Sequence, residues 1–339
     1  MPPFGHPHRV TVVVPTLGNP LLAACVASLE RQAFSGMEIV VVDNSGKDEA
    51  LQVLRGAAKA HVLSARANLG FGGAINHAYS RFPAEFLATL NDDAEAEPGW
   101  MESLVSALDA DPGAGMAASL VVLAETGRVD SAGMCIARDG SSKQRGHGSP
   151  AGEWEIAGEA LCPSGSAAIY RRAMLEQTGL FEEDFFLYCE DTDLGLRGQW
   201  SGWRCLFVPA ARVRHHYSAS AGRASARKAW LVERNRLRLV VRCLPVSWAL
   251  LAPFSSLARY FWHVVSMLEG QGKAAEYARE GGGALSLAWI VARAHFDLLV
   301  NLRRLWRQRR RIQAKPGSRS RMAEVLRQHR ISLREVARQ

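Results

Sequence analysis

The sequence predicts an α/β fold in which a mostly parallel β-sheet is flanked by helices and followed by a C-terminal helical appendage. Three observations favour this fold. Short apolar runs alternate with helix-like stretches in the first third of the chain, polar residues follow each run, and apolar and basic helical patterns fill the last third. Strands that alternate with helices are typical of a parallel sheet covered on both faces.

Four runs in the first third have the composition of buried strands, and each is followed by a helix-like stretch. The strands are expected at 10–14, 38–42, 61–65 and 86–90, and the helices at 21–32, 48–58, 74–82 and 100–109. Ligands of such sheets bind outside the carboxyl ends of the strands. The residues at these ends are polar, so this edge is the predicted site: Thr16, Asp43, Asn68 and 91–93.

The fourth run ends in Asn91, Asp92 and Asp93, which is the most informative motif of the chain. Adjacent carboxylates raise the energy of ionising one another. A divalent cation removes that cost, and Mg²⁺ and Mn²⁺ prefer oxygen ligands and keep positions open for substrate phosphates. The motif therefore predicts a site for a metal and a diphosphate. A solvated acidic turn before a helix remains the alternative.

Residues 162–216 carry a second group of candidates. Glu190 and Asp191 follow the aromatic stretch 185–188, and apolar surroundings favour the neutral form of a carboxyl group and so make its carboxylate a better base. Alternatively, these acids only open the helix 192–199 and interact with its dipole. Further along, His215 and His216 end a strand-like run, where a neutral imidazole can bind a metal.

Taken together, these motifs resemble the family 2 inverting glycosyltransferases of GT-A fold. Within that family the chain is similar to the bacterial rhamnosyltransferase branch of cell-surface polysaccharide synthesis. The resemblance covers about residues 9–220 and rests on an ordered set of motifs. These are VVVPT at 12–16, VVDNS at 41–45, NLGFGGAIN at 68–76, LNDD at 90–93, SGSAAI at 164–169, GLFEEDFF at 179–186, EDTDL at 190–194 and VPAA at 208–211.

The resemblance implies a nucleotide-sugar donor and assigns residues to it. Pro15 and Thr16 would line the nucleobase pocket, and Asp43 would accept a hydrogen bond from the base. The residues expected on the ribose and diphosphate side are Asn68, Gly70, Asn76, Asn91 and Asp92.

The resemblance also implies a metal site and a catalytic base. Asp93 and His215 would bind Mg²⁺ or Mn²⁺, with Asn91 in the place where the family's acidic motif usually begins with Asp. Asp191 matches the general base, with Glu190 beside it. A carboxylate that takes a proton from an acceptor hydroxyl allows a single displacement, which inverts the anomeric centre. The acceptor side is expected at Gly165 and Ser166.

The composition bounds the cellular context. With 48% hydrophobic and 22% charged residues the chain has an ordinary globular composition. Its six cysteines form no C-x-x-C motif, which argues against zinc and against a disulfide framework and favours reduced thiols in the cytoplasm. The first nine residues have no apolar core, so we expect no signal peptide.

The net charge of +8 is concentrated near the C-terminus, where arginines crowd residues 303–321. The apolar stretches 244–258 and 285–302 are interrupted before they reach the ~18–20 residues of a spanning helix. Together these features favour helices that lie in the interface of the cytoplasmic membrane. Helices for packing or oligomerisation are the alternative. Nucleic acid is not an expected partner, because no reading motif accompanies the basic run.

The sequence thus predicts a catalytic domain at 1–222, a helical, membrane-associating region at 223–312 and a basic tail or helix at 313–339. The expected activity is inverting transfer of a sugar, with dTDP-rhamnose favoured, to a lipid-linked or polysaccharide acceptor at the inner face of the membrane. A UDP-sugar-dependent enzyme of the same fold and a non-catalytic glycan- or lipid-binding scaffold are the alternatives. The glycine-rich segment 138–152 is expected to be a mobile loop.

Overall fold

The structure, a computed structural model, describes residues 8–55, 59–216, 225–279, 283–314 and 318–339. Its contacts divide the chain into two compact units. Unit 1 comprises Met1–Met134, Gln144–Phe186 and Glu190–Ser220. Unit 2 comprises Cys135–Lys143, Leu187–Cys189 and Ala221–Gln339, so two short segments from the first part of the sequence belong to the helical unit.

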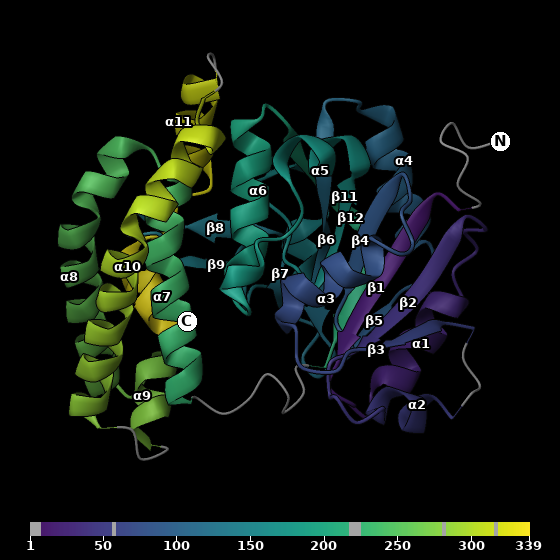
Figure 1. Cartoon of the computed structure of the whole chain (residues 1–339), viewed down its shortest axis with the longest axis horizontal. Coiled ribbons are helices and arrows are strands. Elements are labelled where there is room, and N and C mark those ends of the chain that lie inside the picture. The colour runs from purple at the N-terminus through teal and green to yellow at the C-terminus, as the bar shows by residue number, and fades with distance from the viewer. Residues whose placement is uncertain (1–7, 56–58, 217–224, 280–282, 315–317) are drawn as a thin grey trace. The chain divides into compact units, whose positions relative to one another are not determined.

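Unit 1 is built on a mixed sheet in which one half is parallel, as the alternation of strands and helices predicts (Figure 1). The neighbouring strands of this half run in the order β4-β1-β2-β3, and all their pairings are parallel. The fold class predicted from the sequence is confirmed. The elements of this half are β1 (Val10–Thr16), α1 (Leu22–Glu30), β2 (Met37–Asp43), α2 (Glu49–Leu54), β3 (His61–Ser64), α3 (Gly70–Tyr79) and β4 (Phe86–Leu90).

The other half of the sheet follows the order β10-β12-β6-β11 and joins the first half at β4. Here β11 runs antiparallel to both of its neighbours, β4 and β6, so this half is mixed rather than parallel. Its strands are β5 (Ala94–Ala96), β6 (Ala114–Leu123), β7 (Val129–Ser131), β10 (Gly158–Ala160), β11 (Ala167–Arg171) and β12 (Arg204–His215).

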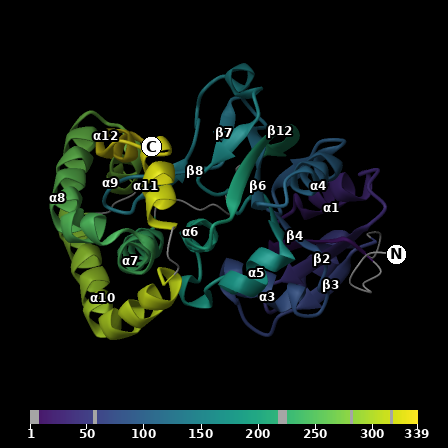
Figure 2. The same cartoon turned by 90° about the horizontal axis from the view of Figure 1, so that it is seen from above.

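Helices cover both faces of the sheet of unit 1. Figure 2 shows α1 and α4 on one face and α3 and α5 on the other. One core cluster joins β1, β4 and β6 to α1 and α4 and includes the fully buried Leu22 and Trp100, whose indole Nε1 donates to Ser119 Oγ at 2.9 Å. The remaining helices of this unit are α4 (Trp100–Ala110), α5 (Arg172–Thr178) and α6 (Glu190–Trp200).

Unit 2 is helical, with α7 and α10 as its most closely packed pair. A capping box at Ser332 and Glu335 begins the last helix, and the buried Met322, Leu326 and Val336 show that the predicted basic tail packs as helices. The elements are α7 (Ala226–Cys243), α8 (Val246–Leu268), α9 (Gly272–Arg279), α10 (Ala284–Ile312), α11 (Ser318–Gln328) and α12 (Leu333–Arg338).

The prediction of a mobile loop at 138–152 is wrong for residues 138–144. The strands β8 (Met134–Ile136) and β9 (Ser142–Gln144) pair, and the turn between them carries Asp139, which is fully buried. Arg259 Nε donates to Asp139 Oδ2 at 2.6 Å, and Arg236 lies 3.5 Å from the same oxygen. A buried carboxylate needs such partners, and they fix the turn.

One helix of the described chain passes a length and composition test for a membrane span. It covers Leu285–Ile312, with a mean hydropathy of 1.3 over its best window, of which 11% is buried. The charged residues that interrupt its sequence face α7: Asp297 forms an ion pair with Arg238 at 2.9 Å, and Arg293 lies over the Trp230 ring at 4.2 Å. These contacts favour packing of α10 along α7.

Candidate functional site

Strand register places the two predicted halves of the site side by side in unit 1. Because β11 is antiparallel to β4, Ala167 at its start pairs with Leu90 at the end of β4. The turn before β11 therefore lies beside the acidic residues that follow β4. In the same way β12 pairs with β5, which sets His215 opposite Ala94 and next to Asp93.

Asp93 and His215 form one end of a buried chain of polar side chains. His215 Nε2 lies 3.0 Å from Asp93 Oδ1, and His215 Nδ1 lies 2.8 Å from Asp130 Oδ2. His147 Nδ1 in turn lies 3.2 Å from Asp130 Oδ1. The second histidine of the tandem, His216, is separate, because its Nε2 contacts Glu95 Oε1 at 2.7 Å.

Electrostatics polarise this chain. Burial lowers the pKa of His215, but hydrogen bonds to Asp130 and Asp93 outweigh it and raise that pKa to about 9. Burial raises the pKa of Asp130, but the contacts with His147 and His215 outweigh it and lower that pKa to about 2. Without a metal ion, the imidazole of His215 is therefore protonated at neutral pH and lies between two carboxylates.

The donor set of this chain fits a divalent cation. Asp93 Oδ1 and His215 Nε2 face one another, and Asp130 holds the other ring nitrogen, which is the usual arrangement around a metal-binding histidine. In the described residues no three His, Cys, Asp or Glu side chains are already grouped to hold a metal. Two protein ligands with positions left for a diphosphate and water are what Mg²⁺ usually has.

Asp92 and Thr16 connect the ends of β4 and β1. Thr16 Oγ1 donates to Asp92 Oδ2 at 2.6 Å, and Asn19 Nδ2 donates to Asp92 Oδ1 at 3.3 Å. Burial, followed by the charge of Asp93, raises the pKa of Asp92, while the Thr16 hydrogen bond lowers it. The predicted donor residue Pro15 precedes Thr16 in β1 and is half-buried.

The structure gives the Asp43 side chain a role in its own turn. The carboxylate is fully buried, with Ser45 N donating to Oδ1 at 2.8 Å and Ala50 N donating to Oδ2 at 2.7 Å. Its neighbour Asn44, which is not among the predicted donor-binding residues, reaches α3 by donating from Nδ2 to Gly70 O at 3.1 Å. A contact of Asp43 with a nucleobase stays a prediction.

The predicted residues of the 68–76 motif fix their own turn and contact the segment around residues 181–186 of unit 1. Asn68 Oδ1 accepts from Gly70 N at 2.8 Å, and Asn76 Nδ2 donates to Phe181 O at 2.9 Å. Gly70 has φ +74°, and a Cβ there would lie 2.2 Å from Phe186 O. Only glycine allows this approach, in which Phe71 N donates to the same carbonyl at 2.8 Å.

The turn at Gly165 and Ser166 links the acidic motif to the predicted base. Asn91 N donates to Ser166 O at 2.9 Å, and Gly165 N donates to Asp191 Oδ2 at 3.0 Å. Thr89 Oγ1, from β4, donates to Gly165 O at 2.8 Å. One short turn thus fixes the residues after β4 and the start of α6, and even a Cβ atom at position 165 would lie 2.9 Å from the Phe71 ring.

Glu190 and Asp191 differ in their surroundings although they are adjacent. Asp191 is half-buried and also accepts from Thr192 N at 2.6 Å; burial raises its pKa and these hydrogen bonds lower it. Burial, and then the charge of Asp191, raises the pKa of Glu190 to about 8, and its Oε2 is buried without a hydrogen-bond partner. At pH 7 Glu190 is therefore neutral, so Asp191 is the better candidate for the base.

The third acid of the EDTDL motif, Asp193, is structural. It is fully buried and accepts from Arg197 Nε at 2.8 Å. Arg197 also donates to the carbonyls of Thr178, Gly179 and Leu180 at 2.8–2.9 Å. This pair fixes the first turn of α6, on which Asp191 lies.

The backbone immediately before the two acids is strained. Phe186, Tyr188 and Cys189 have φ of 62°, 72° and 68°, and they account for three of the five non-glycine residues with positive φ in the described chain. Each such residue costs about 1–2 kcal/mol. Backbone strain of this kind persists where the surroundings hold it, and it clusters at functional sites.

Two residues of the site, Asp130 and His147, are not among the residues predicted from the sequence. Asp130 and His147 lie in the region between the motifs, and only the register of β6, β7 and β12 brings Asp130 to His215. The one available signal is that Asp130 lies in a short apolar segment, where a carboxylate needs a partner.

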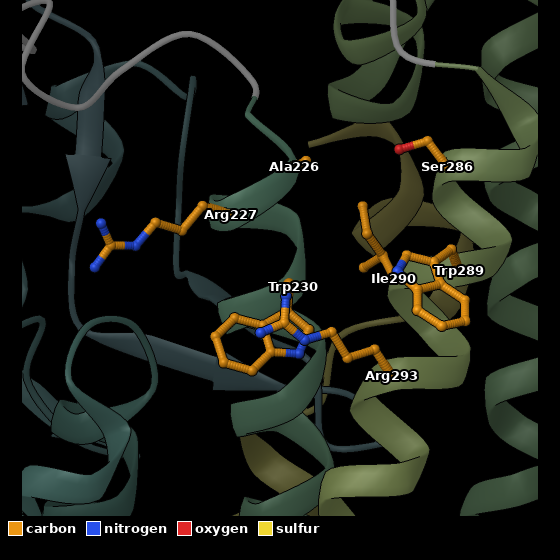
Figure 3. A pocket seen from close by; sticks show the side chains of 7 residues that line it. All are labelled: Ala226, Arg227, Trp230, Ser286, Trp289, Ile290 and Arg293. Atoms are coloured by element: carbon orange, nitrogen blue, oxygen red, sulfur yellow. The ribbon is translucent and has the colours of Figure 1, made fainter.

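A cavity of about 390 Å³ lies in unit 2, between α7 and α10 (Figure 3). In Figure 3 Arg293 reaches the Trp230 ring, whereas Arg227 points away from the other labelled side chains. None of the predicted catalytic or donor-binding residues lines this cavity. Its lining residues are Ala226, Arg227, Trp230, Ser286, Trp289, Ile290 and Arg293.

Comparison with known proteins assigns the class. Residues 11–179 match the model of glycosyl transferase family 2. Unit 1 of the chain is therefore a family 2 glycosyltransferase domain, and the protein is a glycosyltransferase. The matched segment contains the 12–16, 41–45, 68–76, 90–93 and 164–169 motifs, as the resemblance implied.

Two curated bacterial proteins are similar to about three fifths of this chain. The chain is 29% identical over 232 residues to N-acetylglucosaminyl-diphospho-decaprenol L-rhamnosyltransferase of Mycobacterium tuberculosis, covering 61% of this chain and 76% of that protein. It is 30% identical over 228 residues to the O-antigen biosynthesis protein RfbC of Myxococcus xanthus, covering 62% of this chain but 18% of that protein.

Solved structures share the fold at low sequence identity. The mannosyltransferase PcManGT of Pyrobaculum calidifontis, in complex with GDP-Man and Mn²⁺, has a TM-score of 0.51 and 17% identity, covering 90% of this chain and 89% of that one. Residues 1–349 of TarS from S. aureus, in complex with UDP, give a TM-score of 0.55 and 16% identity, covering 96% and 90%.

Proposed function

We propose that the protein is a metal-dependent inverting glycosyltransferase that moves rhamnose from dTDP-rhamnose to a lipid-linked or polysaccharide acceptor. The observation that supports it most is the Gly165–Ser166 turn, which contacts both the acidic motif through Asn91 and the base candidate Asp191. A donor diphosphate bound near Asn91 and an acceptor hydroxyl bound near Asp191 would lie on the two sides of this turn, with the Asp191 carboxylate beside the hydroxyl.

Asp191 would act as the base of a single displacement. Its carboxylate is oriented by the Gly165 and Thr192 amides, and its raised pKa makes it a stronger proton acceptor than an exposed Asp. It would take the proton of the attacking acceptor hydroxyl. Because Glu190 is neutral at pH 7, it adds no second negative charge beside Asp191. This chemistry inverts the anomeric centre and needs no covalent intermediate on the protein.

Asp93 and His215 would hold the cation, and Asp130 would keep the imidazole in the required orientation. When bound, Mg²⁺ or Mn²⁺ would neutralise charge that develops on the leaving nucleoside diphosphate. Pro15, Thr16, Asp43 and Asp92 remain the proposed donor-binding residues on the other side.

The donor is proposed from the relatives. The mycobacterial relative is named as an L-rhamnosyltransferase, which favours dTDP-rhamnose. The structural neighbours contain GDP-Man or UDP, so the fold by itself does not select the nucleotide. A UDP-sugar-dependent transferase is therefore the alternative.

We place the protein at the inner surface of the cytoplasmic membrane through unit 2. The helices α8 and α10 each expose a row of large apolar side chains, and Figure 2 shows both helices beside α7. Exposed arginines at the end of α10 would attract anionic lipid: Arg303, Arg307, Arg310 and Arg311. The Arg293 and Trp230 side chains of the neighbouring cavity suit an anionic amphiphile as well.

The test is a panel of nucleotide sugars incubated with the full-length protein, a synthetic N-acetylglucosamine-diphospho-lipid and Mg²⁺ or Mn²⁺. We expect nucleotide release with dTDP-rhamnose, loss of release in EDTA and recovery when metal returns. Asp93→Ala should be inactive but folded. Release that is independent of metal, or a preference for a UDP-sugar, would contradict the corresponding part of the proposal.

A further inference from the structure

The segment Leu187–Cys189 directly precedes the two acids but belongs to unit 2. Its backbone is unusual, because Tyr188 and Cys189 both have left-handed φ values. Neither residue is a glycine, asparagine or aspartate, the types that tolerate this region best. Something other than local preference must hold the segment, and its partners in unit 2 identify what does so.

Asn235, in the middle of α7, grips this segment. Its Nδ2 donates to the carbonyl oxygens of Leu187 and Tyr188, both at 2.8 Å, and the residue is fully buried. Its Oδ1 accepts from Arg234 Nε at 2.9 Å, so both the NH₂ group and the oxygen of the amide are hydrogen-bonded. The two hydrogens of one amide group thus fix two successive peptide units.

Further contacts within unit 2 secure the segment and the helix. Lys228 Nζ lies 5.6 Å from the centre of the Tyr188 ring, and Ser142 Oγ lies 3.9 Å from Cys189 Sγ. On α7 itself, Arg236 is buried against Glu233 and Asp139, which anchors the turn of the helix that follows Asn235. Asn235 therefore acts from a rigid position.

The consequence for the site follows from chain continuity. Cys189 is bonded to Glu190, and one residue later Asp191 must present its carboxylate to Gly165 N at 3.0 Å. If the left-handed turn relaxed, the start of α6 would shift. A displacement of about 1 Å in a reacting group can lower a rate by about 100-fold.

We propose that Asn235 is a positioning residue for the catalytic base, and that the helical unit thereby contributes to catalysis as well as to acceptor or membrane binding. The proposal rests on the proposed function in one respect, the role of Asp191 as the base. Helix α7 lies outside residues 11–179, the segment that matches the family 2 model, so the proposal gives a catalytic role to a part of the chain beyond that match.

The first test is Asn235→Ala in the full-length protein, assayed with dTDP-rhamnose, the synthetic lipid-linked acceptor and Mn²⁺. We expect kcat to fall by about 10- to 100-fold while the Kd for dTDP, measured by calorimetry, stays at the wild-type value. The matched control is Asn301→Ala, because Asn301 Nδ2 donates to one carbonyl of its own helix, Asp297 O, at 2.9 Å. Its kcat should not change.

A second variant covers the case in which Asn235→Ala does not fold. Asn235→Asp keeps the volume and the acceptor for Arg234 but has no hydrogens to donate to the two carbonyls, so it should show the same loss of kcat. Hydrogen exchange of the peptide spanning residues 186–191 should be faster in both variants than in the wild type or Asn301→Ala.

The two readouts separate the hypotheses. If the wild type transfers no rhamnose, the proposed function fails, and hydrogen exchange still tests whether Asn235 holds the segment. Wild-type kcat in both Asn235 variants, or equal losses of kcat and of dTDP affinity, or unchanged exchange at 186–191 would each overturn the positioning role.

Discussion

Glu190 is a buried carboxyl group beside a second carboxyl group, and this pairing distinguishes two otherwise similar residues. Its pKa is raised to about 8, so the folded protein retains a proton that the unfolded chain loses near pH 4.5. The stability of the wild type should therefore fall with rising pH between these two values, by up to about 1.4 kcal/mol per pH unit.

Glu190→Gln removes this dependence, because a neutral amide replaces a neutral acid. We predict that the melting temperatures of Glu190→Gln and of the wild type are similar at pH 5, and that the variant becomes the more stable protein as the pH rises toward 8. Above pH 8 the difference should remain constant. Calorimetric melting across this range is the measurement, and parallel curves at all pH values would show that Glu190 titrates normally.

The tandem histidines provide a matched pair for the metal site. His215 contacts Asp93 and Asp130, whereas His216 contacts Glu95. We predict that His215→Ala abolishes Mn²⁺-dependent turnover and that His216→Ala leaves the Mn²⁺ requirement unchanged. Asp130→Asn, which removes the charge that supports the His215 imidazole, should weaken Mn²⁺ binding by about 10- to 100-fold.

Titration of turnover with Mn²⁺ measures all three variants. Equal effects of the two histidine substitutions would refute the assignment of His215, and normal Mn²⁺ affinity in Asp130→Asn would remove Asp130 from the site.

Several residue roles could be predicted from the sequence and others could not. The motifs placed Asp92, Asp93 and Asp191 at strand or helix ends because local patterns determine those ends. Asp130 and Asn235 contact residues that are distant in the sequence. No local sequence pattern predicts the register of β7 or the contact of α7 with residue 188.

At the scale of elements, the antiparallel strand β11 makes the site possible. It enters between β4 and β6 and sets its own beginning beside the end of β4. Alternating strands and helices predicted the parallel half of the sheet correctly, because each crossover is local in the sequence. They did not predict that the strand after the Gly165 turn lies antiparallel between β4 and β6, because each of these pairings joins residues at least 50 positions apart in the sequence.

The turn between β8 and β9 shows the same limit. Its glycine, serine and charged residues are typical of a mobile loop, but Asp139 is buried among Arg236, Arg259 and the helices that carry them. The composition of the segment indicates that it is polar, but it cannot indicate that distant helices provide Arg236 and Arg259 as partners for Asp139.

This buried cluster gives a prediction on stability. Among the described residues, Asp139→Ala leaves Arg259 and Arg236 with Glu233 as their one acidic partner, so we expect a loss of about 3–5 kcal/mol in the free energy of unfolding. The control is Asp109→Ala, which breaks the exposed ion pair with Arg9 and should cost about 0–1 kcal/mol. Urea denaturation compares them, and losses of equal size would contradict a structural role for the cluster.

At the scale of the whole molecule, the chain combines a family 2 glycosyltransferase domain with a helical unit. The helical unit also includes Cys135–Lys143 and Leu187–Cys189, which lie between segments of unit 1 in the sequence. The boundary predicted at residue 222 does not reflect this. A protein that ended there would lack the partners of Asp139 and of the Leu187 and Tyr188 carbonyls. Variants of the full chain are therefore better probes than truncation.

The exposed apolar rows of unit 2 predict binding to membranes. Phe254 on α8 is 71% exposed and Trp289 on α10 is 70% exposed. We predict that Phe254→Asp and Trp289→Asp reduce binding to phosphatidylglycerol vesicles at low salt, and that salt weakens binding of the wild type. Ile156→Asp is the control, because Ile156 is equally apolar and 87% exposed but lies in unit 1.

Vesicle co-sedimentation measures this binding. If the wild type does not bind, or if all three substitutions reduce binding alike, the apolar rows serve packing or oligomerisation instead.

In the proposed mechanism, Asp191 removes the acceptor proton in a single inverting displacement. The most direct measurement combines turnover of Asp191→Asn and Glu190→Gln with the anomeric configuration of the wild-type product, read from its C1–H1 NMR coupling. We expect an inverted product, a loss of about 10²–10⁴ in kcat for Asp191→Asn with dTDP binding retained, and a milder loss for Glu190→Gln. A product with retained configuration, or a larger loss for Glu190→Gln than for Asp191→Asn, would contradict this mechanism.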